Sequence, residues 1–179
     1  MSGASGAVYG IRLLEALRET PVESHLVMSR AAAMTIAYET DRTAEQVRKL
    51  ADVAYPVGDI GAAIASGSYR TAGMVVAPCS IRTLSEVATC ATSNLLTRAA
   101  DVVLKERRRL VLLVRETPLH TGHLRMMAQA SESGAIIMPP VPAFYSKPQS
   151  LDDMIDHTIG RVLDLFDIDN ALVKRWKDG

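Results

Sequence analysis

Cysteine, aromatic side chains, net charge and long apolar runs are all scarce in this sequence of 179 residues. Its two cysteines cannot form a disulfide-stabilised scaffold, so a reducing, cytoplasmic compartment is expected. Twenty basic residues balance twenty acidic ones, which argues against a nucleic-acid partner. The longest apolar run, residues 110–114, has the length of a buried strand and is far too short to span a membrane.

Aliphatic surface, by contrast, is abundant. Hydrophobic residues make up 48% of the chain although aromatics account for only 4%, and the mean hydropathy is +0.11. The length fits a single domain, residues 1–179. For one domain of this size, the apolar bias indicates surface that is buried between subunits, so we expect a homo-oligomer.

Short aliphatic segments alternate with segments of helical period. Four segments have the composition and the flanking turns of buried parallel strands. They are residues 23–28, 73–77, 110–115 and 135–138. One helical stripe runs from Val8 to Leu17, and a second helix-compatible stretch runs from Ala88 to Val103. This alternation predicts an α/β fold, a Rossmann-like or flavodoxin-like three-layer sandwich around a parallel sheet.

The first strand of that fold is missing from the sequence. Residues 3–6, Gly-Ala-Ser-Gly, look like a loop between a strand and a helix, yet only two residues precede them. A strand of about 5–6 residues would normally stand there. We therefore expect a parallel sheet that lacks one strand beside this loop.

Small hydroxyl residues follow three successive strand positions. Ser5 lies in the Gly-rich loop, Ser29 follows residues 23–28, and Ser80 opens a segment that ends at Thr83. Each serine could simply cap a helix, and the Gly-rich loop alone could be an ordinary turn. Because the carboxyl ends of parallel strands meet in one crevice, their convergence favours a phosphate-bearing cofactor.

Two charged residues, Arg115 and Glu116, stand at the end of the strand predicted at residues 110–115. A surface ion pair is one interpretation. We favour a functional one, because charged groups at the carboxyl end of a strand face the crevice rather than bulk solvent. If the strand period persists, the two side chains point in opposite directions.

Three patterns that can hold metals or act as nucleophiles are interpreted here as structural. Residues 152–156 match an Asp-Asp-x-x-Asp magnesium motif, but Ser150 begins a capping box there and no second acidic cluster is present. His120 and His123 have no third ligand nearby. Cys79 has no histidine close in sequence, which favours a buried small residue over a nucleophile. We expect a site without metal.

Together these residues resemble the flavin prenyltransferases, a family of the flavoprotein superfamily that also contains the cysteine decarboxylases. The similarity is close and nearly full length. The segments that carry it are residues 3–10, 25–29, 77–83, 99–106, 115–119 and 142–145. The last three are specific to the family, whereas the Gly-rich loop is widely shared.

The resemblance implies reduced FMN as a bound substrate, dimethylallyl phosphate as prenyl donor, and prenylated FMN as product for a partner decarboxylase, as in ubiquinone biosynthesis. It also implies a homododecamer. The residues that would contact FMN are Gly3, Ala4, Ser5, Ser29, Ser80, Ile81, Arg82, Thr83 and Arg115. Those that would hold the donor phosphate are Lys105, Arg115, Tyr145 and Arg161, with Glu116 beside them. The implied catalytic residues are Ser5, Glu39, Lys105 and Glu116, and Arg98 matches the family as well.

Two other functions are less favoured. A cysteine decarboxylase of the same superfamily would need a catalytic histidine and an Asn-containing loop after the strand at residues 73–77, and residues 78–83 contain neither. A flavin carrier without chemistry would not need the second phosphate site that the resemblance implies.

Overall fold

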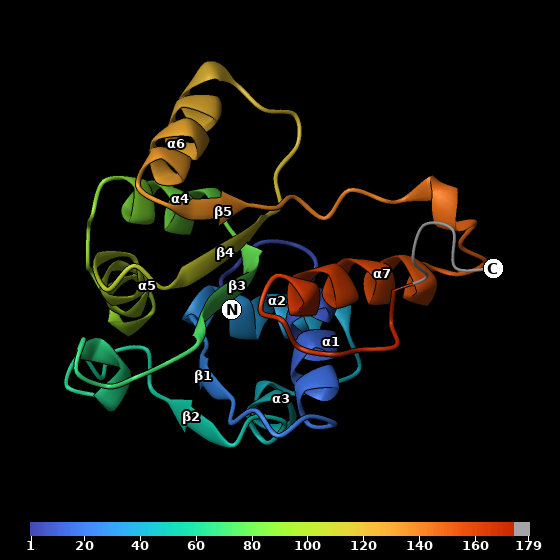
Figure 1. Cartoon of the computed structure of the whole chain (residues 1–179), viewed down its shortest axis with the longest axis horizontal. Helices are drawn as coiled ribbons and strands as arrows, with labels where there is room; N and C mark the ends of the chain where they lie inside the picture. The colour runs from blue at the N-terminus through green and yellow to red at the C-terminus, as the bar shows by residue number, and fades with distance from the viewer. Residues whose placement is uncertain (174–179) are drawn as a thin grey trace.

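The computed structural model describes residues 1–173 and shows two parallel sheets packed between helices (Figure 1). One sheet pairs β1 (His25–Val27) with β2 (Val53–Tyr55). The other contains β3 (Gly73–Cys79), β4 (Arg109–Val114) and β5 (Ala135–Ile137), in that order. The predicted parallel α/β class is confirmed, and the sheet is divided into two parts at the place where a strand was expected to be missing.

Helices cover both faces of the sheets. The α-helices among the described residues are α1 (Ala7–Leu17), α2 (Arg30–Glu39), α3 (Ala44–Arg48), α4 (Ile81–Ala88), α5 (Leu95–Lys105), α6 (Thr121–Glu132) and α7 (Leu151–Asp164). Short 3-10 turns occur at η1 (Ala63–Ala65) and η2 (Phe144–Ser146). None of the helices within residues 1–173 is long and apolar enough to cross a membrane.

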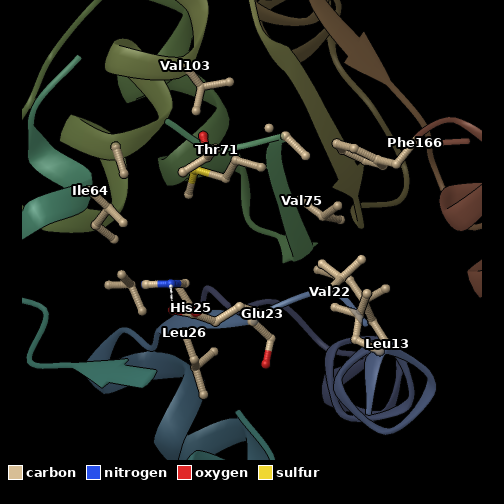
Figure 2. Close-up of a pocket in the computed structure, with 18 of the residues that line it drawn as sticks. Leu13, Val22, Glu23, His25, Leu26, Ile64, Thr71, Val75, Val103 and Phe166 are labelled. Atoms are coloured by element: carbon tan, nitrogen blue, oxygen red, sulfur yellow. Dashed lines mark hydrogen bonds and ion pairs between the residues drawn. The ribbon is translucent and has the colours of Figure 1, made fainter. Parts of the chain in front are cut away.

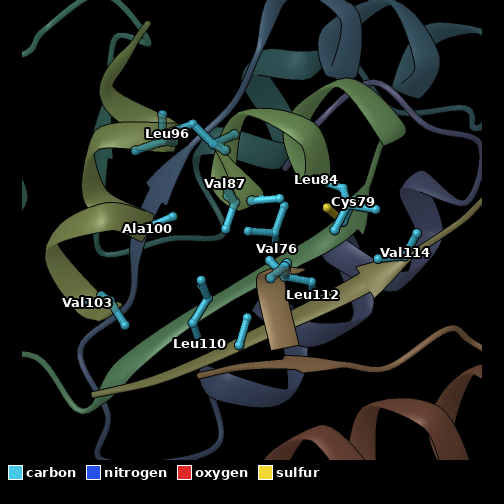
Figure 3. Packing of buried hydrophobic residues seen from close by; sticks show 14 of the residues in the cluster. Val76, Cys79, Leu84, Val87, Leu96, Ala100, Val103, Leu110, Leu112 and Val114 are labelled. Atoms are coloured by element: carbon cyan, nitrogen blue, oxygen red, sulfur yellow. The ribbon is translucent and has the colours of Figure 1, made fainter. Parts of the chain in front are cut away.

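Strand β4 divides its side chains between two cores. Leu110 and Leu112 are fully buried against α4 and α5 (Figure 3), whereas Val111 and Leu113 face the core formed with α1 and α7. This alternation follows the two-residue period of a strand. Each such side chain contributes roughly 1.5–3 kcal/mol on burial, so β4 is strongly held in the middle of its sheet.

Helix α1 joins the two sheets. Its Leu13 packs in the core of the three-stranded sheet, whereas Ile11 and Leu14 pack with Leu26 of β1 and Ile36 of α2. The helical stripe predicted from Val8 to Leu17 therefore touches both parts of the divided sheet, although Val8 and Leu17 themselves are only partly buried.

Several local predictions require correction. Strand β2 was not foreseen. The helix expected from Ala88 to Val103 is two helices, because the chain turns at Cys90, which has a φ of 57°, and restarts at Asn94. Asn94 caps α5 by accepting hydrogen bonds from the backbone N–H groups of Leu96 and Thr97.

The serines expected to begin helices do so. Ser29 accepts a hydrogen bond from Ala32 N at 3.0 Å at the start of α2, and Ser80 accepts one from Thr83 N at the start of α4. Ser150 caps α7 in the same way. These bonds satisfy backbone N–H groups that the first turn of a helix leaves without a partner. The hydroxyls of Ser29 and Ser80 are thereby held at the carboxyl ends of β1 and β3.

Candidate active site

The Gly-rich loop enters α1 in a conformation that only glycine adopts easily. Gly6 has a φ of 99°, in the left-handed region, and no side chain of its own to cap the helix. Gly3 lies so close to α2 that a Cβ there would approach Ala31 Cβ to 2.2 Å. The loop is thereby pressed against α2, and the N–H groups of Gly6 and Ala7 point toward the end of that helix.

A carboxylate occupies the beginning of α1. Glu39, the last residue of α2, accepts hydrogen bonds from Gly6 N at 2.8 Å and Ala7 N at 3.0 Å. Partial burial alone would raise the pKa of Glu39, but the bonds from the Ser5 hydroxyl, Ala7 and Gly6 and the charge of Arg115 hold it below its usual value. The amino end of α1 is therefore an anion-binding position whose occupant here is an ionised side chain.

Arg115 supplies a positive charge at the same edge. Its backbone N–H donates to Cys79 O at 3.0 Å, which ties the end of β4 to the end of β3, and its side chain is exposed. Its charge lowers the pKa of Glu39 and also acts on Tyr9, whose pKa burial raises. Ser5, Tyr9, Glu39 and Arg115 thus gather where α1 begins.

The start of α4 forms the adjoining wall. Ser80 donates its hydroxyl to Thr83 Oγ1 at 3.2 Å, and its backbone N–H donates to Ser2 Oγ at 2.8 Å. Arg82 extends into solvent and pairs with Glu86 at 2.9 Å. The start of α4 is therefore fixed by local hydrogen bonds, and the guanidinium beside it is exposed and paired with Glu86.

The chemistry of this edge is that of an anion and hydroxyl cradle. Backbone N–H groups, serine hydroxyls and guanidinium groups are the donors that proteins use for phosphate. Within residues 1–173 no group of three or more His, Cys, Asp or Glu side chains is arranged to hold a metal ion. The donor set suits a phosphate-bearing organic ligand.

A family model described as Flavoprotein matches residues 1–176. The chain belongs to the Flavoprotein family. This flavoprotein is 60% identical over 176 residues to "Flavin prenyltransferase UbiX" of Thauera aromatica, a match that covers 98% of this chain and 91% of that protein. It is therefore a member of the flavin prenyltransferases within the larger family.

Solved structures agree with this assignment. The crystal structure of AnUbiX (PadA1) in complex with FMN and dimethylallyl pyrophosphate has a TM-score of 0.98 and 51% identity, and covers 100% of this chain and 95% of that chain. A dodecameric FMN-dependent UbiX-like decarboxylase from Escherichia coli O157:H7 has a TM-score of 0.95 and 47% identity, covering 99% of this chain and 100% of that chain.

The residues implied to hold the donor phosphate are not gathered in one protomer of this flavoprotein. Lys105 ends α5, where it pairs with Glu106 beside Gly67. That position is at the amino end of β4, whereas Arg115 follows its carboxyl end. A strand of this length spans on the order of 20 Å, so Lys105 and Arg115 cannot contact one phosphate within a protomer.

Tyr145 and Arg161 flank a histidine of α7. The Tyr145 hydroxyl lies 3.0 Å from His157 Nε2, with the two rings edge to face. Burial and then the charge of Arg161 lower the pKa of His157, and Arg161 itself pairs with Asp164 at 2.9 Å. Tyr145 of η2 and Arg161 of α7 thus both lie near His157.

Two further residues implied by the resemblance have local partners. The Glu116 carboxylate accepts a hydrogen bond from Thr117 N at 3.0 Å and is exposed. Arg98 donates to Ala65 O and to Asp101, which holds the turn η1 against α5. The structure gives Arg98 a structural contact and leaves Glu116 accessible beside Arg115.

Cys79, the histidine pair and the acidic start of α7 make local packing contacts or hydrogen bonds. Cys79 is fully buried, and burial raises the pKa of its thiol to about 12, whereas Cys90 is exposed on the turn between α4 and α5. His120 caps α6 by accepting from Gly122 N, and its ring lies against that of His123 at 3.6 Å between centroids, tilted by 33°. Asp153 accepts a hydrogen bond from Gln149 N at the start of α7.

Two residues of the edge were not foreseen from the sequence. Tyr9 lies one turn into α1 from Gly6 and within the influence of Arg115. Ser2 is buried and joins Ser80 N to Pro78 O through its hydroxyl. The spacing of Tyr9 from the Gly-rich loop was a usable signal, since a residue three positions after a helix cap faces the same side.

Proposed function

We propose that this protein, acting as a single domain, transfers a dimethylallyl group from dimethylallyl phosphate to reduced FMN and releases prenylated FMN. One observation carries the proposal. The anion cradle formed by the start of α1, Ser5 and Arg115 lies in a chain that is similar over its full length to flavin prenyltransferases.

The residues present fit FMN. The hydroxyls of Ser5, Ser29 and Ser80 and the first turn of α4 lie at the carboxyl edge of the sheets, where a flavin phosphate would find hydrogen-bond donors, while Glu39 accepts from the N–H groups at the start of α1. The resemblance adds Gly3, Ala4, Arg82 and Thr83 to this set, and Arg82 among them is exposed at the start of α4. Reduced FMN supplies the nucleophilic N5 and C6 positions.

The protein's task toward the prenyl donor is electrostatic. An allylic C–O bond ionises more easily when cations stabilise the departing phosphate, and Arg115 stands at the edge where that charge develops. A monophosphate that is bound by Arg and Lys needs no magnesium. Exclusion of water and orientation of the two reactants complete the catalysis, and no covalent enzyme intermediate is needed.

Glu39 and Ser5 are the residues placed to hold or move a proton beside the flavin. Their side chains are hydrogen-bonded to each other at the start of α1. Glu116, exposed next to Arg115, is placed to stabilise positive charge on the prenyl group or to accept a proton. In each role the carboxylate acts through its charge, so replacement of Glu39 or Glu116 by Gln would keep the shape of the side chain and remove its function.

The phosphate subsite is completed by a neighbouring subunit in this proposal. Lys105 and Arg161 are half-exposed, Tyr145 is 53% exposed, and Lys105 lies at the far edge of the sheet from Arg115. The solved UbiX-like relative is dodecameric. A homododecamer would bring the outside of α7 and the end of α5 of different copies toward the Arg115 edge.

The product implies a partner. Prenylated FMN is of use only to an enzyme that binds it, so we propose delivery to a decarboxylase in the cytoplasm, as in ubiquinone biosynthesis. The alternative of a cysteine decarboxylase is not favoured, because its histidine and asparagine have no counterparts in residues 78–83.

The deciding experiment is incubation with reduced FMN and either dimethylallyl phosphate or dimethylallyl pyrophosphate, without metal, followed by mass spectrometry of the released flavin. We expect a mass gain of one prenyl unit with the monophosphate. One control omits the donor, and a second repeats the complete reaction with a chelator added.

Three other outcomes would count against the proposal. Unmodified flavin together with tight FMN binding would indicate a carrier. Loss of carbon dioxide from a cysteine-containing peptide would indicate a decarboxylase. Prenyl transfer that stops when the chelator is added would contradict the metal-free site.

A further inference from the structure

A buried histidine lies behind the exposed turn η2. His157 of α7 is only 8% exposed, and its Nε2 is 3.0 Å from the hydroxyl oxygen of Tyr145. Tyr145, on η2, is more than half exposed. Because a buried polar nitrogen needs a hydrogen-bond partner, this contact is part of how α7 and η2 fit together. It joins an accessible phenol to an inaccessible imidazole.

Helix α7 holds His157 in place from both sides in sequence. Its neighbour Asp156 pairs with Arg12 of α1, with 3.3 Å between Asp156 Oδ2 and the terminal nitrogen of Arg12. Ile159 and Leu163 are buried in the core that α7 shares with α1. The histidine backbone is therefore tied to the body of the protein by an ion pair and by apolar packing.

The inward contacts of α7 lie away from this pair. Val162 and Leu163 line a cavity of about 440 Å³ between β1 and β3, and Figure 2 shows Phe166 at its wall. Tyr145 and His157 are not among the residues that line the cavity. The contact between them is thus a separate feature, on the part of α7 that η2 covers.

The segment around η2 has little apolar packing of its own. Val141 and Phe144, on either side of the entry into the turn, are both exposed. Ser146 Oγ donates to Ala143 O at 2.7 Å, a bond that stays inside the turn. An exposed aromatic side chain on such a turn would sample several rotamers, so the bond to His157 restricts where the Tyr145 hydroxyl lies.

The direction of that bond depends on which ring nitrogen carries hydrogen. Burial, and then the charge of Arg161, lower the pKa of His157 below 6.5, although Asp164 opposes them, so the ring is neutral above neutral pH. A neutral imidazole carries one N–H. If Nε2 lacks it, Nε2 accepts the phenol hydrogen. If Nε2 carries it, Nε2 donates to the phenol oxygen, and the phenol hydrogen is directed away from His157.

We propose that His157 is a positioning residue for the phosphate of the prenyl donor: its Nε2–H donates to Tyr145 and thereby directs the phenol hydrogen toward a phosphate oxygen. An anion selects this arrangement, because the phenol then meets it as a donor rather than with a lone pair. Arg161, four residues along α7, lies on the same side of the helix and supplies charge. The inference rests on the proposed function and adds a residue that does not itself touch the donor.

The test compares His157→Gln and His157→Leu, each alone and combined with Tyr145→Phe. The Gln amide keeps an N–H that can donate to the phenol, whereas Leu removes the donor. The matched control is Thr158→Val, which removes a hydroxyl from the next buried residue of α7, where it donates to Met154 O.

Two quantities are measured on each variant. Calorimetry gives the binding of dimethylallyl phosphate in the presence of oxidised FMN, a state that cannot transfer the prenyl group because transfer needs reduced flavin. Steady-state prenylation of reduced FMN gives kcat/KM for the donor. FMN titration shows whether the flavin site is intact.

We expect His157→Leu to weaken donor binding and to lower kcat/KM about tenfold, with FMN binding unchanged. His157→Gln should stay within about twofold of the parent, since it keeps the donated hydrogen bond. Thr158→Val should match the parent. Combined with Tyr145→Phe, His157→Leu should have no further effect, because the hydroxyl that it orients is gone. If His157→Leu does not fold, His157→Met, which also lacks a donor, takes its place.

A tenfold loss from His157→Leu in the Tyr145→Phe background would overturn the inference, because His157 would then act by another route. His157→Gln as weak as His157→Leu would overturn it too, and so would a parent that does not bind dimethylallyl phosphate. Donor binding that follows the expected pattern without any prenylated flavin would contradict the proposed function alone. Prenyl transfer that no His157 substitution changes would contradict this inference alone.

Discussion

Substitutions of the adjacent residues Arg115 and Glu116 should have different effects on binding and turnover. Arg115→Ala removes the proposed charge-assisted contact to phosphate, worth roughly 1.5–3 kcal/mol, so donor and FMN binding should weaken about ten- to hundredfold. Glu116→Gln keeps the shape and most hydrogen bonding, so binding should persist while turnover falls. Flavin titration and steady-state kinetics measure the two effects.

The matched control for these variants is Arg125→Ala, which removes an exposed arginine of α6 and should change neither quantity. If Glu116→Gln turns over as fast as the parent, that carboxylate is only structural. If Arg115→Ala binds FMN and donor normally, Arg115 does not hold a phosphate at this edge.

The residues of the edge differ in how well the sequence predicts them. Ser29, Ser80 and Arg115 follow directly from strand ends, because the geometry of parallel sheets gathers such positions. Glu39 came only through the family resemblance, since its bonds to Gly6 and Ala7 cross 32 or more positions of sequence. A contact of that kind depends on how α1 and α2 pack, which local pattern does not encode.

The free energy of unfolding should depend on pH through His157, which joins η2 to α7. His157 has a pKa below its ordinary value of 6.5, because burial and the Arg161 charge disfavour the protonated ring. The unfolded chain therefore binds a proton first as pH falls, so the free energy of unfolding should be greatest above about pH 7 and decline through pH 6.5 toward the lower native pKa.

Urea unfolding between pH 7.5 and pH 5 measures that decline. His157→Gln should make the decline shallower, whereas His120→Gln, at the start of α6, should leave it as in the parent. An unchanged slope in His157→Gln would show that other groups control the stability of the protein in this range.

At the level of elements, the aliphatic segments were the reliable signal. All four predicted strands are present, and no end is shifted by more than two residues. Strand β2 was missed because its three residues are only partly buried or exposed, which leaves no aliphatic run to detect. The break between α4 and α5 was missed because the left-handed turn falls on Cys90, a residue that gives no turn signal.

At the scale of the whole molecule, a shared phosphate site predicts complementation between two inactive variants. Lys105→Ala and Arg115→Ala should each lose prenyl transfer alone. In mixed oligomers some sites combine the intact Arg115 of one copy with the intact Lys105 of another, so random mixing should restore about a quarter of the activity. Co-expression followed by a flavin prenylation assay checks this.

As a control, each variant is expressed alone under the same conditions, which should restore no prenyl-transfer activity. If the mixed oligomers are as inactive as the single variants, Lys105 and Arg115 do not come from different copies to form one site. Light scattering on the same samples should report a homododecamer, and an active monomer would contradict the subunit-shared site.

The unequal settings of Cys79 and Cys90 give every subunit a single reactive thiol. A maleimide reagent reacts with the thiolate, so the buried Cys79, with its pKa near 12, is protected while the exposed Cys90 is open to attack. A fluorophore would therefore attach once per chain, on the turn between α4 and α5. Stepwise photobleaching of one labelled particle would then count its subunits directly.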